Sequence, residues 1–342
     1  MQMIELENRN GCKAALSTLG ASVRSLHVPT KRGNLIDVVL GLSSEDAYKN
    51  DELYIGVTIG RYSGRIAGGQ FKLPGGVVRL DQNQPPNHLH GGVTGLHQRH
   101  WVISELAGDS AEFSCRSPDG EGGYPGSLDV CVRYTLRADN ALQIDYRAVS
   151  DADTVINLTN HSYFNLAGHD RGSALSHCLE IRSSQIAEID KESIPTGRTV
   201  PVEGTLFDFR SPAVVGQRID REDPQLELAG GFDHAWVLEG GEEQLHEPVA
   251  ILFAAESGVS MRVSTDQTSI QFYSANFVPD AWVGKSGATY GAHQGLCLET
   301  QHLPNSPNEP AFPSTLLRAG DVFRSQTVYA FDVGYPSEWA DA

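Results

Sequence analysis

The chain has 342 residues, of which 40% are hydrophobic and 20% are charged, and this composition excludes an intrinsically disordered protein. The 26 basic and 43 acidic side chains leave a net charge of −17, which repels phosphate groups and so argues against nucleic acid or an anionic membrane surface as a partner. The first residues include Glu5 and Glu7 and lack the apolar stretch of a signal peptide, and no apolar run approaches the roughly 20 residues of a membrane-spanning helix.

The five cysteines are widely separated, and no two of them have the CxxC spacing of a zinc site or a redox pair. Their odd number and wide spacing also disfavour a disulfide framework. We therefore expect reduced thiols in the core of a cytoplasmic protein.

Alternation of apolar and polar residues is the dominant pattern along the chain. After one short helical turn expected within 43–50, the alternation is clearest over 130–136, 142–148 and 259–263. Turn clusters rich in glycine and proline separate such segments. Strands without intervening helices predict an all-β fold, in which antiparallel sheets pack as a sandwich or close as a barrel.

Domain boundaries are not visible in the composition. The chain has no low-complexity linker and no repeat of fixed period, so residues 1–342 are expected to form a single domain. The tail after Gly334 is expected to be frayed or only loosely docked.

Two of the twelve histidines stand out by their surroundings. His90 lies in the sequence NHLHGG, where the glycines allow backbone or ligand to approach closely. His161 lies within 154–169, a segment with no Asp, Glu, Lys or Arg but with many amides and hydroxyls. Such a segment suits hydrogen bonding to a neutral polyol, and a buried amide network that closes a sheet is the alternative. Other histidines, among them His97 and His177, are expected to be solvated or to cap turns.

Further segments combine aromatic residues with single polar or charged side chains. This composition is typical of sugar sites, because aromatic rings pack on the apolar faces of a sugar while polar groups bind its hydroxyls. Glu299 follows an apolar strand, a position at which a glutamate is usually paired or functional. The segments are 54–66 with Arg61 and Arg65, 230–238, 269–277 and 295–304.

A metal site is one alternative use of these residues. His88 and His90 are two positions apart and would share one face of a strand, and His161 with Glu299 would complete a set of histidine and carboxylate ligands. The chain has no P-loop or Rossmann glycine motif and no GxSxG motif, which argues against a nucleotide-binding enzyme and a serine hydrolase.

Seven segments resemble, in their order along the chain, the motifs of the aldose 1-epimerases (galactose mutarotases). The resemblance covers about Met1 to Tyr335 and includes GRYSGRIAGGQF, NHLHGG, NLTNHSYFNLAG, GTLFDFR, GGFDHAWVL, QFYSANF and GLCLETQHLPNSPN. It implies a large antiparallel β-sandwich, the galactose mutarotase-like supersandwich, with the sugar in an open cleft. It also implies interconversion of the α and β anomers of free aldohexoses such as galactose and glucose, without a cofactor or a metal.

The resemblance further implies the site residues. Glu299 corresponds to the general base of the family and His161 to its general acid. The implied catalytic residues are Glu299, His161 and His90. The implied substrate-binding residues are Arg65, Asp233 and Gln271. Two positions depart from the family pattern, since Gly64 stands where many members have Asn, and Leu206 stands where many have Pro.

The chemistry of mutarotation agrees with this set. A proton leaves O1 while another reaches the ring oxygen, and the open aldehyde turns about C1–C2 before it closes on its other face. One base and one acid suffice, since each contributes roughly 10²–10⁴ in rate. We expect Glu299 as a carboxylate and His161 as an imidazolium, because each charge favours the other. His90 and Arg65 would hold the ring oxygen and nearby hydroxyls, and Asp233 would accept hydrogen bonds from two hydroxyls.

Three alternatives remain open at the level of sequence. Asp233 and Glu299 would serve as the two carboxylates of a glycoside hydrolase. A non-catalytic sugar-binding domain would have the same fold and the same polar residues. An epimerase for phosphorylated hexoses would require further basic residues at the rim of the cleft. The sequence sets neither the preferred aldose nor the oligomeric state.

Overall fold

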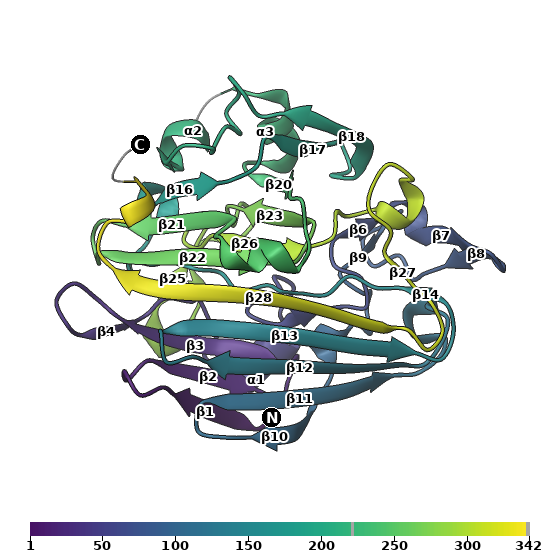
Figure 1. Cartoon of the computed structure of the whole chain (residues 1–342), viewed down its shortest axis with the longest axis horizontal. Helices are drawn as coiled ribbons and strands as arrows, with labels where there is room; N and C mark the ends of the chain where they lie inside the picture. The colour runs from purple at the N-terminus through teal and green to yellow at the C-terminus, as the bar shows by residue number, and fades with distance from the viewer. Residues whose placement is uncertain (220–221, 340–342) are drawn as a thin grey trace.

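The computed structural model describes residues 1–219 and 222–339. Its largest element is an antiparallel sheet of nine strands that spans the length of the molecule (Figure 1). In spatial order these strands are β10 (Val102–Leu106), β11 (Ser110–Ser117), β12 (Leu128–Leu136), β13 (Ala141–Ser150), β28 (Val322–Val333), β22 (Val259–Thr265), β21 (Ala250–Ala254), β16 (Cys178–Ile181) and β19 (Ala213–Val214). The strands expected over 130–136, 142–148 and 259–263 are therefore confirmed.

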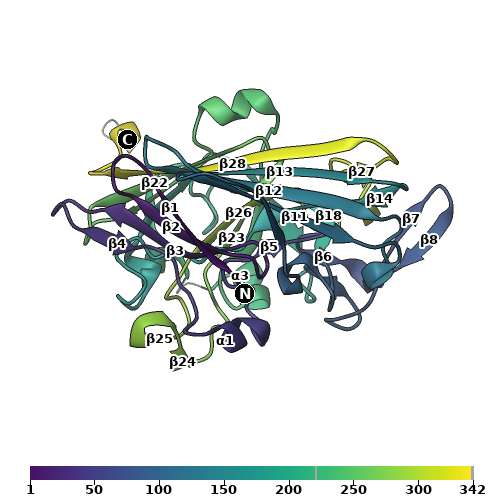
Figure 2. The same cartoon turned by 90° about the horizontal axis from the view of Figure 1, so that it is seen from below.

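Two further antiparallel sheets lie against one side of the nine-stranded sheet (Figure 2). One comprises β1 (Met3–Glu7), β2 (Lys13–Ser17), β3 (Ser22–Pro29) and β4 (Leu35–Asp37). The other has the order β18 (Pro195–Pro201), β17 (Gln185–Ile189), β20 (Asp233–Val237), β23 (Ser269–Tyr273) and β26 (Cys297–Gln301). The hydroxyl of Tyr329 on β28 donates to the carbonyl of Leu298 on β26 over 2.9 Å, which ties the layers together. The expected all-β antiparallel sandwich is confirmed.

Short strand pairs and short helices complete the described chain. The pairs are β5 (Thr58–Ile59) with β15 (Thr159–Asn160), β6 (Arg65–Ile66) with β9 (His88–Leu89), β7 (Gln70–Leu73) with β8 (Gly76–Arg79), β14 (Thr154–Val155) with β27 (Leu316–Leu317), and β24 (Trp282–Val283) with β25 (Thr289–Tyr290). The α-helices are α1 (Glu45–Lys49), α2 (Gly216–Ile219) and α3 (Pro224–Ala229). The 3-10 turns are η1 (Ala67–Gly69), η2 (Leu96–Gln98), η3 (Glu121–Gly123), η4 (Ala174–Ser176), η5 (Glu242–His246), η6 (Lys285–Gly287), η7 (Ser306–Asn308) and η8 (Ser337–Trp339). The helical turn expected within 43–50 is α1, which Ser44 caps by accepting the Ala47 N–H.

The main core lies between the layers and follows from the alternation in the sequence. On β12, Val130, Val132 and Tyr134 are buried, while the residues between them are partly exposed. These side chains belong to one apolar cluster that also includes Leu26 of β3 and Leu298 of β26. Full burial of one such aliphatic side chain stabilises the fold by about 1.5–3 kcal/mol.

The C-terminal tail is docked as far as the structure describes it, so the expectation of a frayed or loosely docked tail is wrong for residues 335–339. Trp339 is only 3% exposed, and its ring packs against Phe253 and Tyr335. Its indole N–H donates to Glu180, and Arg262 forms an ion pair with Glu338. Residues 340–342 lie outside the described part of the chain. Within the described part, no helix has the length and apolar character needed to cross a membrane.

Candidate active site

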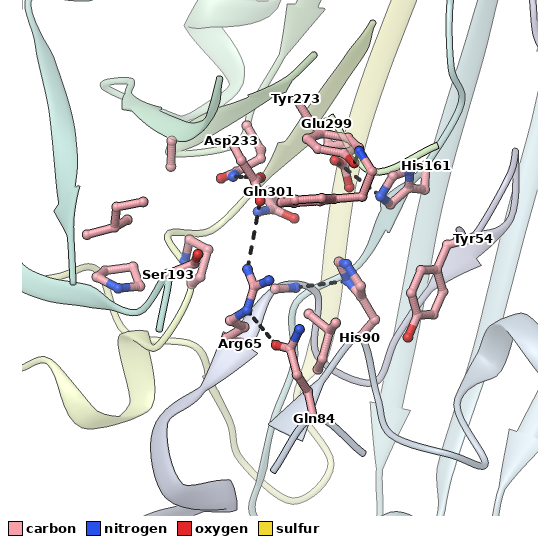
Figure 3. A pocket seen from close by; sticks show the side chains of 18 of the residues that line it. Tyr54, Arg65, Gln84, His90, His161, Ser193, Asp233, Tyr273, Glu299 and Gln301 are labelled. Carbon is pink, nitrogen blue, oxygen red and sulfur yellow. Dashed lines mark hydrogen bonds and ion pairs between the residues drawn. The ribbon is translucent and has the colours of Figure 1, made fainter. Parts of the chain in front are cut away.

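A cavity of about 200 Å³ lies over one face of the five-stranded sheet (Figure 3). Segments far apart in sequence supply its wall, from the turn before β5 to the loop after β26. The structure brings all six expected site residues to this one cavity, namely Arg65, His90, His161, Asp233, Gln271 and Glu299.

The strand register explains why three of these side chains meet. Gln271 on β23 lies directly opposite Glu299 on β26, and Asp233 on β20 lies opposite Tyr273, which is two residues from Gln271. Residues directly opposite one another, and residues two apart on one strand, share a face of a sheet. The intervening residues, such as Trp236 and Phe272, point the other way into the apolar core. The alternation of these strands thus gives the sheet one apolar face and one face that lines the cavity.

Asp233 is held in place by two neighbours. The Gln271 side-chain amide donates to its Oδ1 over 2.7 Å, and Nη1 of Arg65 lies 3.9 Å from its Oδ2. Arg65 is oriented in turn by Gln84, whose Oε1 accepts its Nε–H over 2.7 Å (Figure 3). Burial raises the pKa of Asp233, and the Arg65 guanidinium and the Gln271 amide counter that rise. Arg65, Asp233 and Gln271 therefore form one connected polar wall.

His161 and Glu299 form a buried pair. Nε2 of His161 lies 3.6 Å from Oε1 of Glu299, and both side chains are less than one tenth exposed. The His161 ring stacks on Tyr163 with a centroid distance of 5.0 Å, and the edge of Tyr273 packs against it. On the other side of the ring, Nδ1 of His161 lies 3.7 Å from the sulfur of Cys297. These contacts fix the imidazole so that one nitrogen points at the glutamate.

Burial opposes the charge states expected for this pair. Burial lowers the pKa of His161 to about 4. Burial raises the pKa of Glu299 well above its usual value, and the nearby Asp233 carboxylate raises it further. Burial therefore favours the form with the proton on Glu299 and a neutral imidazole over the form with a carboxylate and an imidazolium. The desolvation of both groups outweighs their mutual attraction.

His90 lies at the cavity wall as a neutral donor. Its Nδ1 accepts the backbone N–H of Gly64 over 3.2 Å, so the ring proton of the neutral form is on Nε2. Desolvation, together with the neighbouring His161 and Arg65, lowers the pKa of His90 well below its usual value. The ring packs edge-on against Tyr54 with a centroid distance of 4.6 Å.

The hypothesis of a metal site built on His88 and His90 is wrong. β9 ends at Leu89, and His90 has a positive φ of 53°, so the two histidines do not continue one strand face. His88 is fully buried, with Nδ1 bonded to the Asp81 carbonyl and Nε2 bonded to the Tyr124 hydroxyl over 2.7 Å each. Both of its ring nitrogens are thus engaged away from the cavity.

The uncharged polar segment around His161 is mainly a buried amide network, which is the alternative that the sequence left open. The Asn157 amide donates to the carbonyls of Ser63 and His302, and the Asn160 amide donates to the carbonyl of Gly56. These amides anchor the backbone that carries His161. His161 and Tyr163 are the residues of this segment that line the cavity.

Gly64 is suited to its position by conformation and by space. Its φ is +75°, and a Cβ atom built on it would lie 2.8 Å from the Cβ of Pro304. A side chain here would be strained and would collide with Pro304. Glycine therefore allows the backbone N–H to reach His90. The second departure, Leu206, packs against the apolar core.

The other singled-out side chains have structural roles. Arg61 is buried, and its guanidinium donates to the carbonyls of Ser117, Pro118, Pro125 and Gly126. His177 is fully buried, and its Nε2 accepts the Leu166 backbone N–H, which is a capping role as expected. His97 is only 8% exposed and packs against Tyr54, and within the described chain its Nδ1 is buried without a hydrogen-bond partner. The expectation that His97 is solvated or caps a turn is therefore wrong.

Several residues of the site were not singled out from the sequence. Tyr54, Tyr163 and Tyr273 surround the His161 ring, and Gln84 orients Arg65. Tyr54 and Tyr273 lie inside segments noted for their mixed aromatic and polar composition, and Tyr163 lies in the uncharged polar segment around His161. Composition therefore located each segment but not the residue. Gln84 lies in a loop whose sequence gives no such signal.

Comparison with known proteins agrees with this geometry. The sequence model of the family described as aldose 1-epimerase matches residues 2–330. A galactose mutarotase from Homo sapiens is 41% identical over 314 residues, which cover 92% of this chain and 89% of the relative. An aldose 1-epimerase from Escherichia coli K12 is 34% identical over 332 residues, covering 96% and 95%.

Solved structures give the same result. The crystal structure of a GalM/aldose epimerase homologue from C. elegans matches with a TM-score of 0.89 at 32% identity, covering 98% of this chain and 99% of that chain. The structure of a galactose 1-epimerase from Lactobacillus acidophilus matches with a TM-score of 0.85 at 27% identity, covering 97% and 95%. Sequence and fold together show that this chain belongs to the aldose 1-epimerase family.

Proposed function

We propose that this protein interconverts the α and β anomers of free aldohexoses such as galactose and glucose by opening and closing the pyranose ring. The observation that carries the proposal is the buried pair of His161 and Glu299, which places two proton-transfer groups 3.6 Å apart at the wall of one cavity. An acid and a base that act together at the anomeric centre are what the reaction requires.

In the proposed mechanism, Glu299 takes the proton of the O1 hydroxyl and His161 protonates the ring oxygen. His161 and Glu299 together hold the same number of protons in their neutral form and in their ion-pair form. The ion pair that the reaction needs therefore forms without a proton from solvent. Hydrogen bonds from sugar hydroxyls to the Glu299 carboxylate favour its charged form, which moves the shared proton to His161. After rotation about C1–C2, the two groups exchange roles as the ring closes.

The polar wall would hold the sugar during these steps. His90 directs a neutral Nε2–H donor toward the ring oxygen and the neighbouring hydroxyls, and Arg65 polarises the same region. Asp233 accepts hydrogen bonds from two hydroxyls. Within the described chain, Oε1 of Gln271 is buried and finds no hydrogen-bond partner. A sugar hydroxyl that donates to this oxygen would remove the cost of leaving it unsatisfied.

Charge at the cavity supports a neutral sugar over a phosphorylated one. Glu52, Asp233 and Glu299 line the cavity, whereas Arg65 is the one Lys or Arg among the described lining residues. Arg65 is already engaged by Asp233 and Gln84. A sugar phosphate would meet uncompensated negative charge, so we propose that free aldoses are the substrates.

The test is polarimetry on freshly dissolved α-galactose or α-glucose with the wild-type protein and the variants Glu299→Gln and His161→Gln. Each variant is expected to lose at least about 10² in kcat, because each removes one proton-transfer group. Turnover close to wild type in either variant would overturn the role assigned to that residue. A nitrophenyl galactoside serves as a control substrate, because an epimerase leaves it intact and a glycoside hydrolase cleaves it.

We also propose that residues 1–342 act as one aldose 1-epimerase domain and that the protein is cytoplasmic. The cavity takes side chains from residue 52 to residue 304, which supports a single functional unit. All five cysteines are free thiols, which supports a reducing compartment.

A further inference from the structure

Cys297 lies directly behind the catalytic pair. It is two residues before Glu299 on β26, so both side chains project from the same face of the sheet. Cys297 is fully buried and does not line the cavity, whereas Glu299 and His161 do. The proposed epimerase mechanism gives this thiol no role.

The three side chains have the spacing of metal ligands. The sulfur of Cys297 lies 3.7 Å from Nδ1 of His161, whereas Oε1 of Glu299 lies 3.6 Å from the other ring nitrogen, Nε2. An ion binds through only one of these nitrogens, so the two distances do not by themselves describe one site. One ligand atom from each residue can be chosen so that all three lie within 4.8 Å of one another. In a tetrahedral zinc site, bonds of about 2.0–2.3 Å place neighbouring ligand atoms about 3.4–3.6 Å apart. The His161 ring and at least one of the other two side chains would have to shift until the three atoms, now within 4.8 Å, reach that spacing around one ion.

The chemistry of the three atoms favours a particular class of ion. Thiolate, imidazole and carboxylate together suit Zn²⁺ and the related thiophilic cations, whereas Mg²⁺ and Ca²⁺ prefer oxygen ligands. Burial and the negative charges of Glu299 and Asp233 raise the pKa of the Cys297 thiol. The same negative field attracts a cation, and a coordinated thiol loses its proton to solvent.

We propose that His161, Cys297 and Glu299 form a three-ligand site for Zn²⁺, and that an ion bound there inhibits the epimerase. The inhibitory part rests on the proposed roles of His161 and Glu299. Coordination occupies the lone pairs that would take and return protons, so the ion and the sugar compete for the same groups. Three protein ligands would leave a fourth position for water, and two of the ligands, His161 and Glu299, line the cavity.

The site is tested first without reference to activity. Cd²⁺ is titrated into metal-free wild-type protein and into Cys297→Ala, Cys297→Ser and Cys115→Ala, and the thiolate-to-metal charge-transfer absorption is recorded. Cys115 is a half-buried free thiol on β11 and serves as the matched control. We expect one equivalent of Cd²⁺ to produce the band in the wild type and in Cys115→Ala, and no band in either Cys297 variant. A band that persists without the Cys297 sulfur, or no band in the wild type, would overturn the site.

Inhibition is tested by polarimetry with Zn²⁺ alone and then with a chelator in excess. Each protein is compared with its own metal-free rate. Zn²⁺ is expected to inhibit the wild type reversibly and competitively with the sugar, and Cys297→Ala is expected to need at least about tenfold more Zn²⁺ than Cys115→Ala. Cd²⁺ binding together with undiminished epimerase activity would overturn the inhibitory role. No epimerase activity in the metal-free wild type would instead overturn the proposed function, and the Cd²⁺ titration would still decide the site.

Discussion

Replacing Glu299 by Gln is expected to lower activity and raise stability at the same time. Glu299 is 3% exposed, and its pKa is raised by burial and by Asp233. The folded protein therefore holds the Glu299 proton more tightly than the unfolded chain does. Glutamine has nearly the same shape and carries no titratable proton, so the variant removes this difference.

The magnitude follows from proton linkage. Below the unfolded-state pKa of glutamate, about 4.3, both states are protonated and Glu299 adds no dependence on pH. Above that value the unfolded state loses the proton first, so the wild-type free energy of unfolding falls by about 1.4 kcal/mol for each pH unit. The fall ends where pH reaches the raised folded-state pKa. Glu299→Gln escapes this loss, so its advantage over the wild type grows as pH rises toward neutrality.

The assay is urea unfolding of both proteins at several pH values between about 5 and 8, with polarimetry on the same samples. Glu203→Gln is the matched control, because its carboxylate is 81% exposed and its ion pair with Arg210 lies at the surface. We expect the stability difference for Glu299→Gln to widen with pH and that for Glu203→Gln to stay constant. A Glu299→Gln variant that is less stable than wild type at neutral pH would show that Glu299 is ionised and paired with a charged His161, which would refute the argument.

Three other outcomes follow from the same geometry. The pH profile of kcat/KM should be level near neutrality and should fall on the acid side with the His161 pKa of about 4, because a second proton then binds to the pair of His161 and Glu299. An acid limb near 6.5 would contradict the burial of His161. Asp233→Asn should lower kcat/KM by about 10–150-fold, mainly through KM, because hydrogen bonds to a charged acceptor are worth about 1.5–3 kcal/mol. An unchanged KM in polarimetry would contradict a role of Asp233 in binding the sugar. Gly64→Ala should lose about 1–2 kcal/mol in urea unfolding, because Gly64 has a φ of +75° and meets Pro304 at 2.8 Å. Gly75→Ala, at a turn with open space and without a positive φ, should retain wild-type stability, and equal losses in the two variants would contradict the steric argument.

Much of the fold could be predicted from local pattern. The alternation over 130–136 and 142–148 follows from strands with one buried face, and that relation needs no tertiary information. The same alternation places Gln271 and Glu299 on one face of a sheet once β23 and β26 are paired. The pairing itself is set by contacts between distant segments, so the cavity could be inferred only through family resemblance.

The rest depends on tertiary surroundings that no motif records. The positive φ of His90 turns the chain out of β9, and this separates His90 from His88 although the two are only two positions apart. The amides of Asn157 and Asn160 satisfy buried backbone carbonyls, a use that looks the same in sequence as binding a polyol. The raised pKa of Glu299 likewise follows from burial by elements far away in the chain.

The central claim is that Glu299 and His161 flank one anomeric carbon, and a crystal structure with bound galactose tests it most directly. We expect O1 of the sugar within hydrogen-bond distance of the Glu299 carboxyl and the ring oxygen within hydrogen-bond distance of Nε2 of His161. A sugar that contacts one of these groups but holds its anomeric carbon away from the other would contradict it.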